Sequence, residues 1–478
     1  MRLVLGSLVC GGAYAVLFGL GDTATGRPVV RGGIFVVWVL CLMVTWWATT
    51  GGFRWRRPVL AVIVAATVVQ LPGVLVPPRT SSDVYRYVWD GRVQLSGTSP
   101  YRYAPLDDRL AGLRDPVLFP GLGPNDRSGY LTEPLPTDRA ELSRRAADDG
   151  RTRINRPRVP TIYPPVAQAW FAAVAAVTPW SVGTLGLQVG SALLAIGMAG
   201  VLSGWLRRRG GNPLFALWWA WCPTVFVEAG NGGHVDIVAT ALVLGAVAVG
   251  ASTAGRRRMR WLAGLLLGLA AAVKLTPLAL APALMPLRRE GLRAALPAPV
   301  AAVLTLATTY LPHAIVAGSL VLGYLPGYLS EEGGARAGVL GFVLPAGWLT
   351  PAIVFVMGVT AVGVMTRVGS RPDPAHAALV LFGMLLLTTT PTYPWYALPL
   401  VALAVLTHRL EWLAVAVAGH LAYEGAGVGV LPATGYAVAA LVVVWVTLAR
   451  AGRLPARLQR RRVSRGSSTA AAPSRRTT

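Results

Sequence analysis

The chain has 478 residues, of which 54% are hydrophobic and only 13% are charged. Repeated apolar runs of about 18 residues are long enough to cross a bilayer, which predicts a polytopic membrane protein and excludes a soluble globular one. The formal net charge of +24 could indicate a nucleic-acid-binding protein, but the arginines cluster in short loops between apolar runs, as in the cytoplasmic loops of membrane proteins. We therefore expect a lipid bilayer, and no nucleic acid, as a partner.

Apolar segments along the chain predict an all-α fold of 12 to 14 transmembrane helices. Fourteen candidate spans cover residues 3–20, 33–50, 58–76, 185–206, 213–230, 236–253, 261–273, 277–287, 295–317, 351–368, 376–390, 396–408, 413–430 and 433–451. An even number of spans puts both termini on one side, and the Arg-rich C-terminal tail predicts that this side is the cytoplasm. The same alternation places the Arg clusters of the short loops inside and the long polar stretch outside.

These spans divide the chain into four parts. We expect N-terminal transmembrane helices over 1–76, an extracytoplasmic loop with interfacial helices over 77–184, a helical membrane core over 185–452, and a disordered basic cytoplasmic tail over 453–478. Within the loop, residues 165–179 are apolar but short and flanked by prolines, so we expect a helix in the outer membrane interface. Residues 77–160 hold 11 of the 20 acidic residues, and a loop of this length is typically functional or disordered. Its Tyr, Trp and mixed-charge content favours function.

The most informative motif begins this loop and reads Asp-Val-Tyr-Arg-Tyr-Val-Trp-Asp-Gly from Asp83. A helix over 83–94 would place Asp83, Tyr87 and Asp90 on one face. The two carboxylates would lie about 10 Å apart along the axis, too far for a carboxylate dyad, so we expect one chemical carboxylate and one supporting residue. A carboxylate in the first turn is also common for purely structural reasons. A carboxylate just outside the bilayer, however, could reach the headgroup of a lipid-linked substrate and act as a general base.

Two further motifs complete a resemblance. Gly97-Thr-Ser-Pro-Tyr101 follows the first motif, and Thr161-Ile-Tyr163-Pro-Pro ends the loop. Together they resemble multi-spanning glycosyltransferases of the GT-C class, and among these the bacterial polyprenyl-phosphate-mannose-dependent mannosyltransferases. The resemblance implies a GT-C-like fold and an Asp base in the first large outer loop. Asp83 matches that position, with Asp90 as the weaker alternative.

Lys274 is an independent candidate, because it is the only lysine beside 43 arginines and lies in an apolar stretch. A charge at the bilayer centre costs roughly 2.5–3.5 kcal/mol on insertion scales. We expect Lys274 near an outer-facing turn, where Thr276 caps and Pro277 begins a second helical limb. An ammonium beside free N–H groups would suit the phosphate of a lipid-linked donor, with Arg86 nearby. The alternative is a lysine that snorkels to the interface.

Polar and aromatic residues at other outer turns are candidate substrate contacts. His234 and Asp236 could bind sugar hydroxyls, although a structural turn is equally consistent, and their spacing is too weak to predict a metal site. Trp395 and Tyr396 could stack on a sugar or prenyl chain, although an aromatic belt at the membrane interface explains them as well. Within the loop, we expect Tyr87 and Tyr163 to contact substrate. The sequence has no phosphate-binding P-loop, and we predict no metal and no cofactor.

We therefore predict an inverting membrane glycosyltransferase of the cell membrane that acts on the extracytoplasmic side. It would transfer a sugar, mannose by the resemblance, from a polyprenyl phosphate donor to a glycan or glycolipid acceptor. One alternative is a lipid-linked sugar transporter or flippase, since intramembrane charges also fit that class. Another is a polysaccharide polymerase or ligase that uses a pyrophosphate donor.

Overall fold

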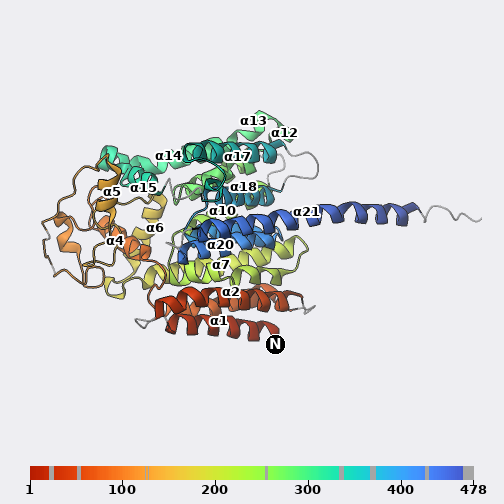
Figure 1. The fold of residues 1–478 in the computed structure, drawn as a ribbon, viewed down its shortest axis with the longest axis horizontal. Helices are drawn as coiled ribbons and strands as arrows, with labels where there is room; N and C mark the ends of the chain where they lie inside the picture. Colours follow the sequence, from red (N-terminus) through yellow and green to blue (C-terminus); the bar gives the residue numbers. More distant parts are fainter. Residues whose placement is uncertain are drawn as a thin grey trace, which may run out of the picture.

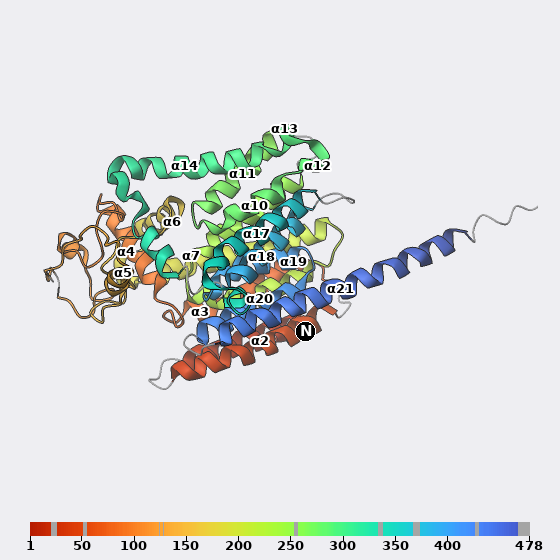
Figure 2. The same cartoon turned by 45° about the horizontal axis from the view of Figure 1, so that its top comes forward.

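The structure, a computed structural model, describes residues 1–20, 26–50, 55–123, 125–127, 129–252, 257–332, 338–366, 373–425 and 430–466. Within these ranges the regular structure is helical throughout and includes no strand, which confirms the predicted all-α class. The long helices run side by side in a bundle (Figure 1). Both views place α4 (Asp83–Leu95), α5 (Arg139–Ala146) and α6 (Pro165–Val177) together at one end of this bundle (Figures 1 and 2).

The bundle contains long helices joined by short helical pieces. The long helices are α1 (Arg2–Leu20), α2 (Gly26–Thr50), α3 (Pro58–Val74), α7 (Leu185–Arg208), α10 (Asp236–Ala251), α11 (Arg257–Ala271), α14 (Pro297–Ala317), α17 (Ala346–Thr366), α18 (Pro374–Thr389), α19 (Leu398–Leu406), α20 (Leu413–Glu424) and α21 (Leu431–Gly466). The short pieces are η1 (Asp108–Leu113), η2 (Trp180–Val182), η3 (Pro213–Ala216), α8 (Leu217–Ala220), α9 (Pro223–Val225), η4 (Phe226–Asn231), η5 (Thr276–Leu284), α12 (Leu287–Glu290), α13 (Leu292–Ala295), η6 (Gly318–Leu322), α15 (Leu325–Glu332), α16 (Gly338–Gly341), η7 (Pro394–Ala397) and η8 (Leu410–Trp412). Proline begins α3, α6, α14 and α18, where its missing N–H has no partner to lose.

Fewer helices are long enough to span a membrane than the predicted count requires. Six helical stretches among the described residues are long and apolar enough to cross: Arg2–Gly19, Gly32–Thr50, Leu185–Arg208, Leu292–Leu322, Gly347–Thr366 and Leu431–Gly452. Two of the predicted spans have no long helix. Residues 213–230 form four short pieces that restart at Pro213 and Pro223, and residues 277–287 form a 3₁₀ helix containing Pro277 and Pro282. Proline interrupts the hydrogen-bond ladder of a continuous helix, so an apolar run does not guarantee a long one.

Both ends of the described chain lie at the same end of the bundle. Met1 and the last turns of α21 lie away from α4, α5 and α6 (Figures 1 and 2). Helix α21 continues to Gly466, so the tail predicted to be disordered from residue 453 begins instead as a helical extension. The Ala, Leu and Arg residues of this extension are good helix formers, which allows the helix to continue beyond its apolar part. The rest of that predicted tail, 467–478, lies outside the described residues.

The predicted outer loop has its own hydrophobic core. Most of its buried residues come from α4, α6 and the segments between them, including Tyr87, Trp89, Phe119 and Phe171. The bundle adds Leu187, Val235, Ala239 and Val273. Tyr87 and Phe171 stack with ring centroids 4.4 Å apart, which joins α4 to α6. Residues 165–177 therefore form the predicted short helix, packed on α4. This core positions the start of α4 at the edge of the bundle.

Two buried aspartates order the irregular segments of the same region. Asp107 accepts hydrogen bonds from the backbone and side chain of Arg109 and from the backbone of Thr132. Burial acts to raise the pKa of Asp107, but these hydrogen bonds outweigh it and lower the value to about 2. Asp149 is bound in the same way by Arg151 and also by Arg158, and its pKa is likewise lowered to about 2. Charge-assisted bonds thus replace regular secondary structure in holding these segments.

Candidate active site

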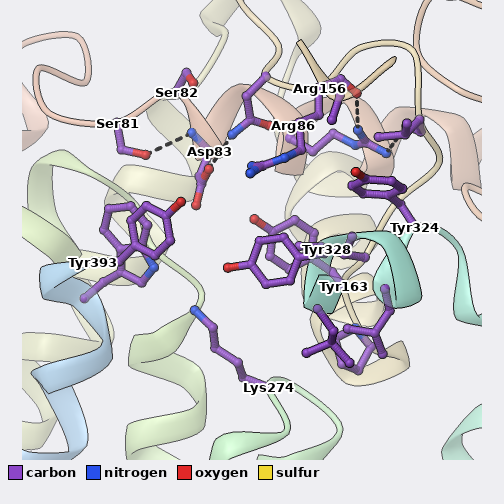
Figure 3. A pocket seen from close by; sticks show the side chains of 18 of the residues that line it. Ser81, Ser82, Asp83, Arg86, Arg156, Tyr163, Lys274, Tyr324, Tyr328 and Tyr393 are labelled. Carbon is purple, nitrogen blue, oxygen red and sulfur yellow. Dashed lines mark hydrogen bonds between the residues drawn. The ribbon is translucent and has the colours of Figure 1, made fainter. Parts of the chain in front are cut away.

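A cavity of about 490 Å³ opens where the region of α4, α5 and α6, the predicted outer loop, meets the bundle. Asp83 and Lys274 both line it, and their side chains point into the same space from opposite walls (Figure 3). The residue expected to act as the base and the residue expected to bind the donor phosphate therefore lie at one cavity. The lining residues are Ser81, Ser82, Asp83, Arg86, Ala146, Ala147, Asp148, Asn155, Arg156, Val159, Pro160, Ile162, Tyr163, Pro164, Lys274, Leu275, Thr276, Tyr324, Leu325, Tyr328, Leu329, Tyr393, Trp395, Tyr396 and Tyr423.

Asp83 is the first residue of α4, as the sequence predicted. Ser82 occupies the N-cap position, and the Asp83 backbone N–H donates to Ser81 Oγ at 3.2 Å. The Asp83 carboxylate is 16% exposed and accepts a hydrogen bond from the side-chain amide of Asn155. Burial raises the pKa of Asp83, although the positive charge of Lys274 and the Asn155 hydrogen bond oppose this effect. A carboxylate with a raised pKa facing a cavity is suited to accept a proton.

Asp90 occupies a different environment although it shares the helix face of Asp83. It is 1% exposed and accepts a hydrogen bond from Arg86 Nε at 2.9 Å. Thr161 Oγ1 and Gln168 Nε2 also donate to it. Asp90 does not line the cavity. Its contacts are those of a supporting residue and give no support to its alternative assignment as the base.

Arg86 lines the cavity, and three of its five N–H donors bind protein groups. Besides Asp90, its guanidinium donates to the carbonyl oxygens of Arg156 and Val159 at 3.4 and 3.2 Å. The side chain is only 4% exposed. These contacts attach α4 to the segment that ends in the Thr161 motif. Arg86 therefore contributes positive charge to the cavity wall, while its contacts with Asp90 and the two carbonyl oxygens fix its position.

Lys274 follows the C-terminal end of α11 and precedes η5. Its ammonium donates to both Asp236 carboxylate oxygens, at 2.8 and 2.9 Å. It also lies 3.9 Å from the ring centroid of Tyr396, in a cation–π contact. These contacts hold it 17% exposed at the cavity wall, rather than extended toward a membrane interface as a snorkelling lysine would be. The expected cap at Thr276 is wrong, since Leu275 occupies the N-cap position of η5 and no side chain caps it; Thr276 instead lines the cavity.

Three predicted substrate contacts lie behind the cavity wall. Tyr87 and His234 are fully buried, Asp236 is 3% exposed, and none of them lines the cavity. Their expected direct contact with a sugar is therefore corrected: Asp236 holds Lys274, and Tyr87 packs between Tyr163 and Phe171. Tyr163 does line the cavity, as predicted.

Aromatic side chains form much of the remaining wall. Trp395 and Tyr396, both predicted, line the cavity, and Trp395 stacks on the buried His234 ring with centroids 3.8 Å apart. Tyr328 joins them through a hydroxyl–hydroxyl contact of 3.3 Å with Tyr396. An aromatic wall of this kind offers ring faces and hydroxyl groups to a sugar or an isoprenoid chain.

Sequence reasoning missed several lining residues. Tyr324 and Tyr328 come from α15 and its leading turn, Tyr423 comes from α20, and Arg156 comes from the end of the outer region. Arg156 lies five residues before Thr161, and its positive φ of 48° marks a turn that the sequence does not reveal. The tyrosines carry no local signal, because their role depends on contacts across more than 60 residues of sequence.

Metal ligands are not clustered in the described part of the chain. Among those residues, no group of three or more His, Cys, Asp or Glu side chains could hold an ion. The polar groups that line the cavity are the carboxylates of Asp83 and Asp148, amide and hydroxyl groups, and cations supplied by Arg86, Arg156 and Lys274.

Two family models match the chain, and each covers part of the cavity wall. Residues 4–114 match the N-terminal domain of an alpha-(1->6)-mannopyranosyltransferase family, and residues 161–391 match glycosyltransferase family 87. The first match contains Asp83 and the second contains Lys274. No curated protein and no solved structure gives a significant match. Both matches indicate a membrane glycosyltransferase, which favours the predicted enzyme over the transporter alternative and supports the predicted resemblance to the GT-C class.

Proposed function

We propose that this enzyme transfers mannose from a polyprenyl phosphate donor to a hydroxyl group of a glycan or glycolipid acceptor, with inversion. The observation that carries the proposal is the single cavity shared by the Asp83 carboxylate and the Lys274 ammonium. The mannopyranosyltransferase description of the family matching residues 4–114 supports mannose as the sugar. The aromatic wall beside Lys274 offers a surface for the isoprenoid chain.

The chemistry follows from the positions of these two groups. Asp83 accepts the proton of the acceptor hydroxyl while that oxygen attacks the anomeric carbon of mannose. The bond between the anomeric carbon and the phosphate oxygen breaks, and its electron pair leaves with polyprenyl phosphate. Lys274 and Arg156 stabilise the negative charge that develops on this leaving group.

We further propose that the cavity opens to the extracytoplasmic side and that both termini lie in the cytoplasm. The termini lie at the end of the bundle away from the outer region in both views (Figures 1 and 2), and Arg clusters in short loops mark the cytoplasmic side. The three native cysteines are buried, so a cysteine introduced at the exposed Arg127 can report sidedness. A membrane-impermeant maleimide should label it in intact cells. Labelling only after the cells are opened would contradict this orientation.

The decisive experiment measures sugar transfer directly. Purified enzyme in lipid nanodiscs is incubated with radiolabelled polyprenyl phosphate mannose and a mannan-type acceptor, and labelled product is counted. The parent should form product, and Asp83→Asn should lose activity by about 10²- to 10⁴-fold, the usual contribution of a general base. Product from a polyprenyl pyrophosphate sugar alone would indicate the polymerase alternative.

Asp126→Asn is the matched control, because it removes an exposed carboxylate from the same outer region by the same substitution. It should transfer mannose at the parental rate. Both variants are compared at equal amounts of monodisperse protein. An Asp83→Asn enzyme that is folded and transfers mannose at the parental rate would remove Asp83 as the base.

A further inference from the structure

The buried imidazole of His234 and the buried carboxyl group of Glu228 form a row of side chains behind Asp83. His234 Nδ1 lies 3.8 Å from Asp83 Oδ2, and His234 Nε2 lies 3.3 Å from Glu228 Oε2. The His234 and Glu228 side chains are both 0% exposed, whereas Asp83 is 16% exposed at the cavity. The three groups therefore run inward from the cavity wall, and only the first can reach a substrate.

The backbone between these residues is built to bring them together. Glu228 lies in the π-helix η4, a form of helix that is rare and often occurs at functional sites. Gly233 follows with a φ of +60°, and a Cβ there would lie 3.0 Å from Val84 Cγ2. A glycine is therefore required for the turn to approach the first turn of α4 this closely. That approach places His234 beside Asp83.

His234 and Glu228, the two inner residues of this row, have polar atoms without hydrogen-bond partners in the described structure. Within the described structure, neither ring nitrogen of His234 and neither carboxyl oxygen of Glu228 has a hydrogen-bond partner of good geometry. Buried polar groups are rarely left unpaired, so these atoms require an explanation. The distances from His234 Nδ1 to Asp83 Oδ2 and from His234 Nε2 to Glu228 Oε2 are 3.8 and 3.3 Å, somewhat longer than a normal hydrogen bond. Catalytic hydrogen bonds are often long without substrate and shorten when it binds.

We propose that His234 is a positioning residue whose Nδ1–H donates to Asp83, while Glu228 fixes that tautomer by donating its O–H to Nε2. The proposal rests on the proposed function of Asp83 as the base. A donor to the ionised carboxylate aims it and favours its charged form, which is the form that accepts a proton. A carboxyl group that is 0% exposed avoids ionisation unless a cation is paired with it, which suits Glu228 as the donor. Trp395 stacks on the ring and holds its plane.

Other groups also act on Asp83 and must be considered in a pH experiment. Asn155 donates to it, Lys274 and Arg156 favour its charged form by their positive charge, and Asp236 lies behind Lys274 with the opposite sign. Besides His234, the titratable and charged groups that act on Asp83 from the packed elements are Tyr87, Arg156, Tyr163, Glu228, Asp236, Lys274 and Tyr423. All of them remain in place when only His234 is changed.

Two amide substitutions separate positioning from packing. In His234→Asn the amide nitrogen takes the place of Nδ1 and can still donate to Asp83, whereas in His234→Gln the amide lies near the Nε2 position and cannot. Both variants lose the ring stacked on Trp395, so packing losses are matched. With the full-length enzyme and polyprenyl phosphate mannose, His234→Gln should lower kcat by about 10- to 100-fold relative to His234→Asn, the equivalent of one hydrogen bond to a charged group.

The pH profile supplies a second readout. Loss of the donor disfavours ionised Asp83, so the acid limb of kcat/KM should move to higher pH in His234→Gln and stay near the parental position in His234→Asn. Equal kcat values and identical acid limbs for the two variants would overturn the proposal. Should neither accumulate as folded protein, Glu228→Gln, which can still donate to Nε2, should exceed Glu228→Leu in kcat by a similar factor, and equality of that pair would overturn it.

The failure of this inference is distinguishable from the failure of the proposed function. If Asp83→Asn is inactive but the two His234 variants behave alike, Asp83 stands as the base and only the positioning role falls. If Asp83→Asn retains parental transfer, the proposed function falls first and the positioning role falls with it.

Discussion

The buried ion pair between Arg86 and Asp90 allows a test of whether Asp83 and Asp90, the two aspartates of α4, have different roles. Asp90→Ala removes the acceptor of Arg86, Thr161 and Gln168 at a position that is 1% exposed. Breaking a buried ion pair from one side costs about 3–5 kcal/mol, because the other charge stays buried without its partner. Arg86 keeps two carbonyl acceptors, and Gln168 also donates to Thr161 at 2.9 Å. These remaining contacts limit the loss to about 4 kcal/mol.

A loss of this size should appear as local opening of α4 rather than as a change confined to catalysis. About 4 kcal/mol corresponds to an increase of roughly 10³-fold in the open population, at 1.4 kcal/mol for each factor of ten. Amide hydrogen exchange followed by mass spectrometry reports this population for peptides that cover Asp83–Leu95. Exchange protection of these peptides should fall by about that factor in Asp90→Ala, whereas peptides from α1, which packs on α2 and α3, should change little.

The matched comparison is Asp83→Asn. Asp83 is partly exposed and has one close side-chain donor, Asn155, to which an amide oxygen can still accept. Its exchange protection in α4 should therefore stay within about tenfold of the parent while sugar transfer is lost. If Asp90→Ala left protection of α4 unchanged and still abolished transfer, the supporting role assigned to Asp90 would be wrong, and a direct role in the reaction would have to be considered.

Three further predictions concern the cavity. Lys274→Met should lower kcat more than it raises the donor KM, as measured by steady-state transfer, because the charge that it stabilises develops as the leaving group departs; a change in KM alone would contradict this. Burial raises the pKa of Asp83, so kcat/KM should fall as the pH decreases through a value above the usual range for Asp. Lys274→Met should move this acid limb of the pH profile to still higher pH, because a positive charge that favours ionised Asp83 is lost. An acid limb at the ordinary value near 3.9 would refute the assignment of Asp83 as the base. Gly323→Ala should destabilise the cavity wall, because the φ of +52° disfavours alanine and its Cβ would lie 1.8 Å from the carbonyl oxygen of Thr161; unchanged thermal unfolding and unchanged exchange protection near Tyr324 would contradict this.

Local sequence patterns predicted the parts of the site that depend on neighbours in the chain. The spacing of Asp83, Tyr87 and Asp90 predicts a helix face, and α4 places all three as expected. The solitary Lys274 was identifiable because an isolated charge in an apolar run requires a partner. Its partner Asp236 was also a candidate, but as a sugar ligand. The sequence could not show that the two side chains bind each other.

Contacts between distant segments account for what the sequence did not predict. Tyr328 reaches the cavity only because α15 packs beside α5 and its hydroxyl meets that of Tyr396. Tyr423 reaches it from α20, where its hydroxyl donates to the carbonyl of Thr80. Neither tyrosine lies in a motif, and the position of each depends on the packing of the whole bundle. The predicted count of spans is not confirmed for a related reason, since prolines inside apolar runs end helices without changing hydropathy.

The pairing of Lys274 explains how a cation can remain in an apolar environment and still serve a ligand. An ammonium has three donors, and the two Asp236 oxygens engage two of them while Tyr396 packs against the charge. These contacts offset much of the cost of desolvating the lysine, and they fix the ammonium at the wall so that little reorganisation is needed when a phosphate arrives. The phosphodiester of a donor carries one negative charge, and the phosphate monoester that leaves carries more. A cation held in place by a carboxylate therefore interacts moderately with the bound donor and more strongly with the departing phosphate, which is the difference that lowers the barrier to transfer.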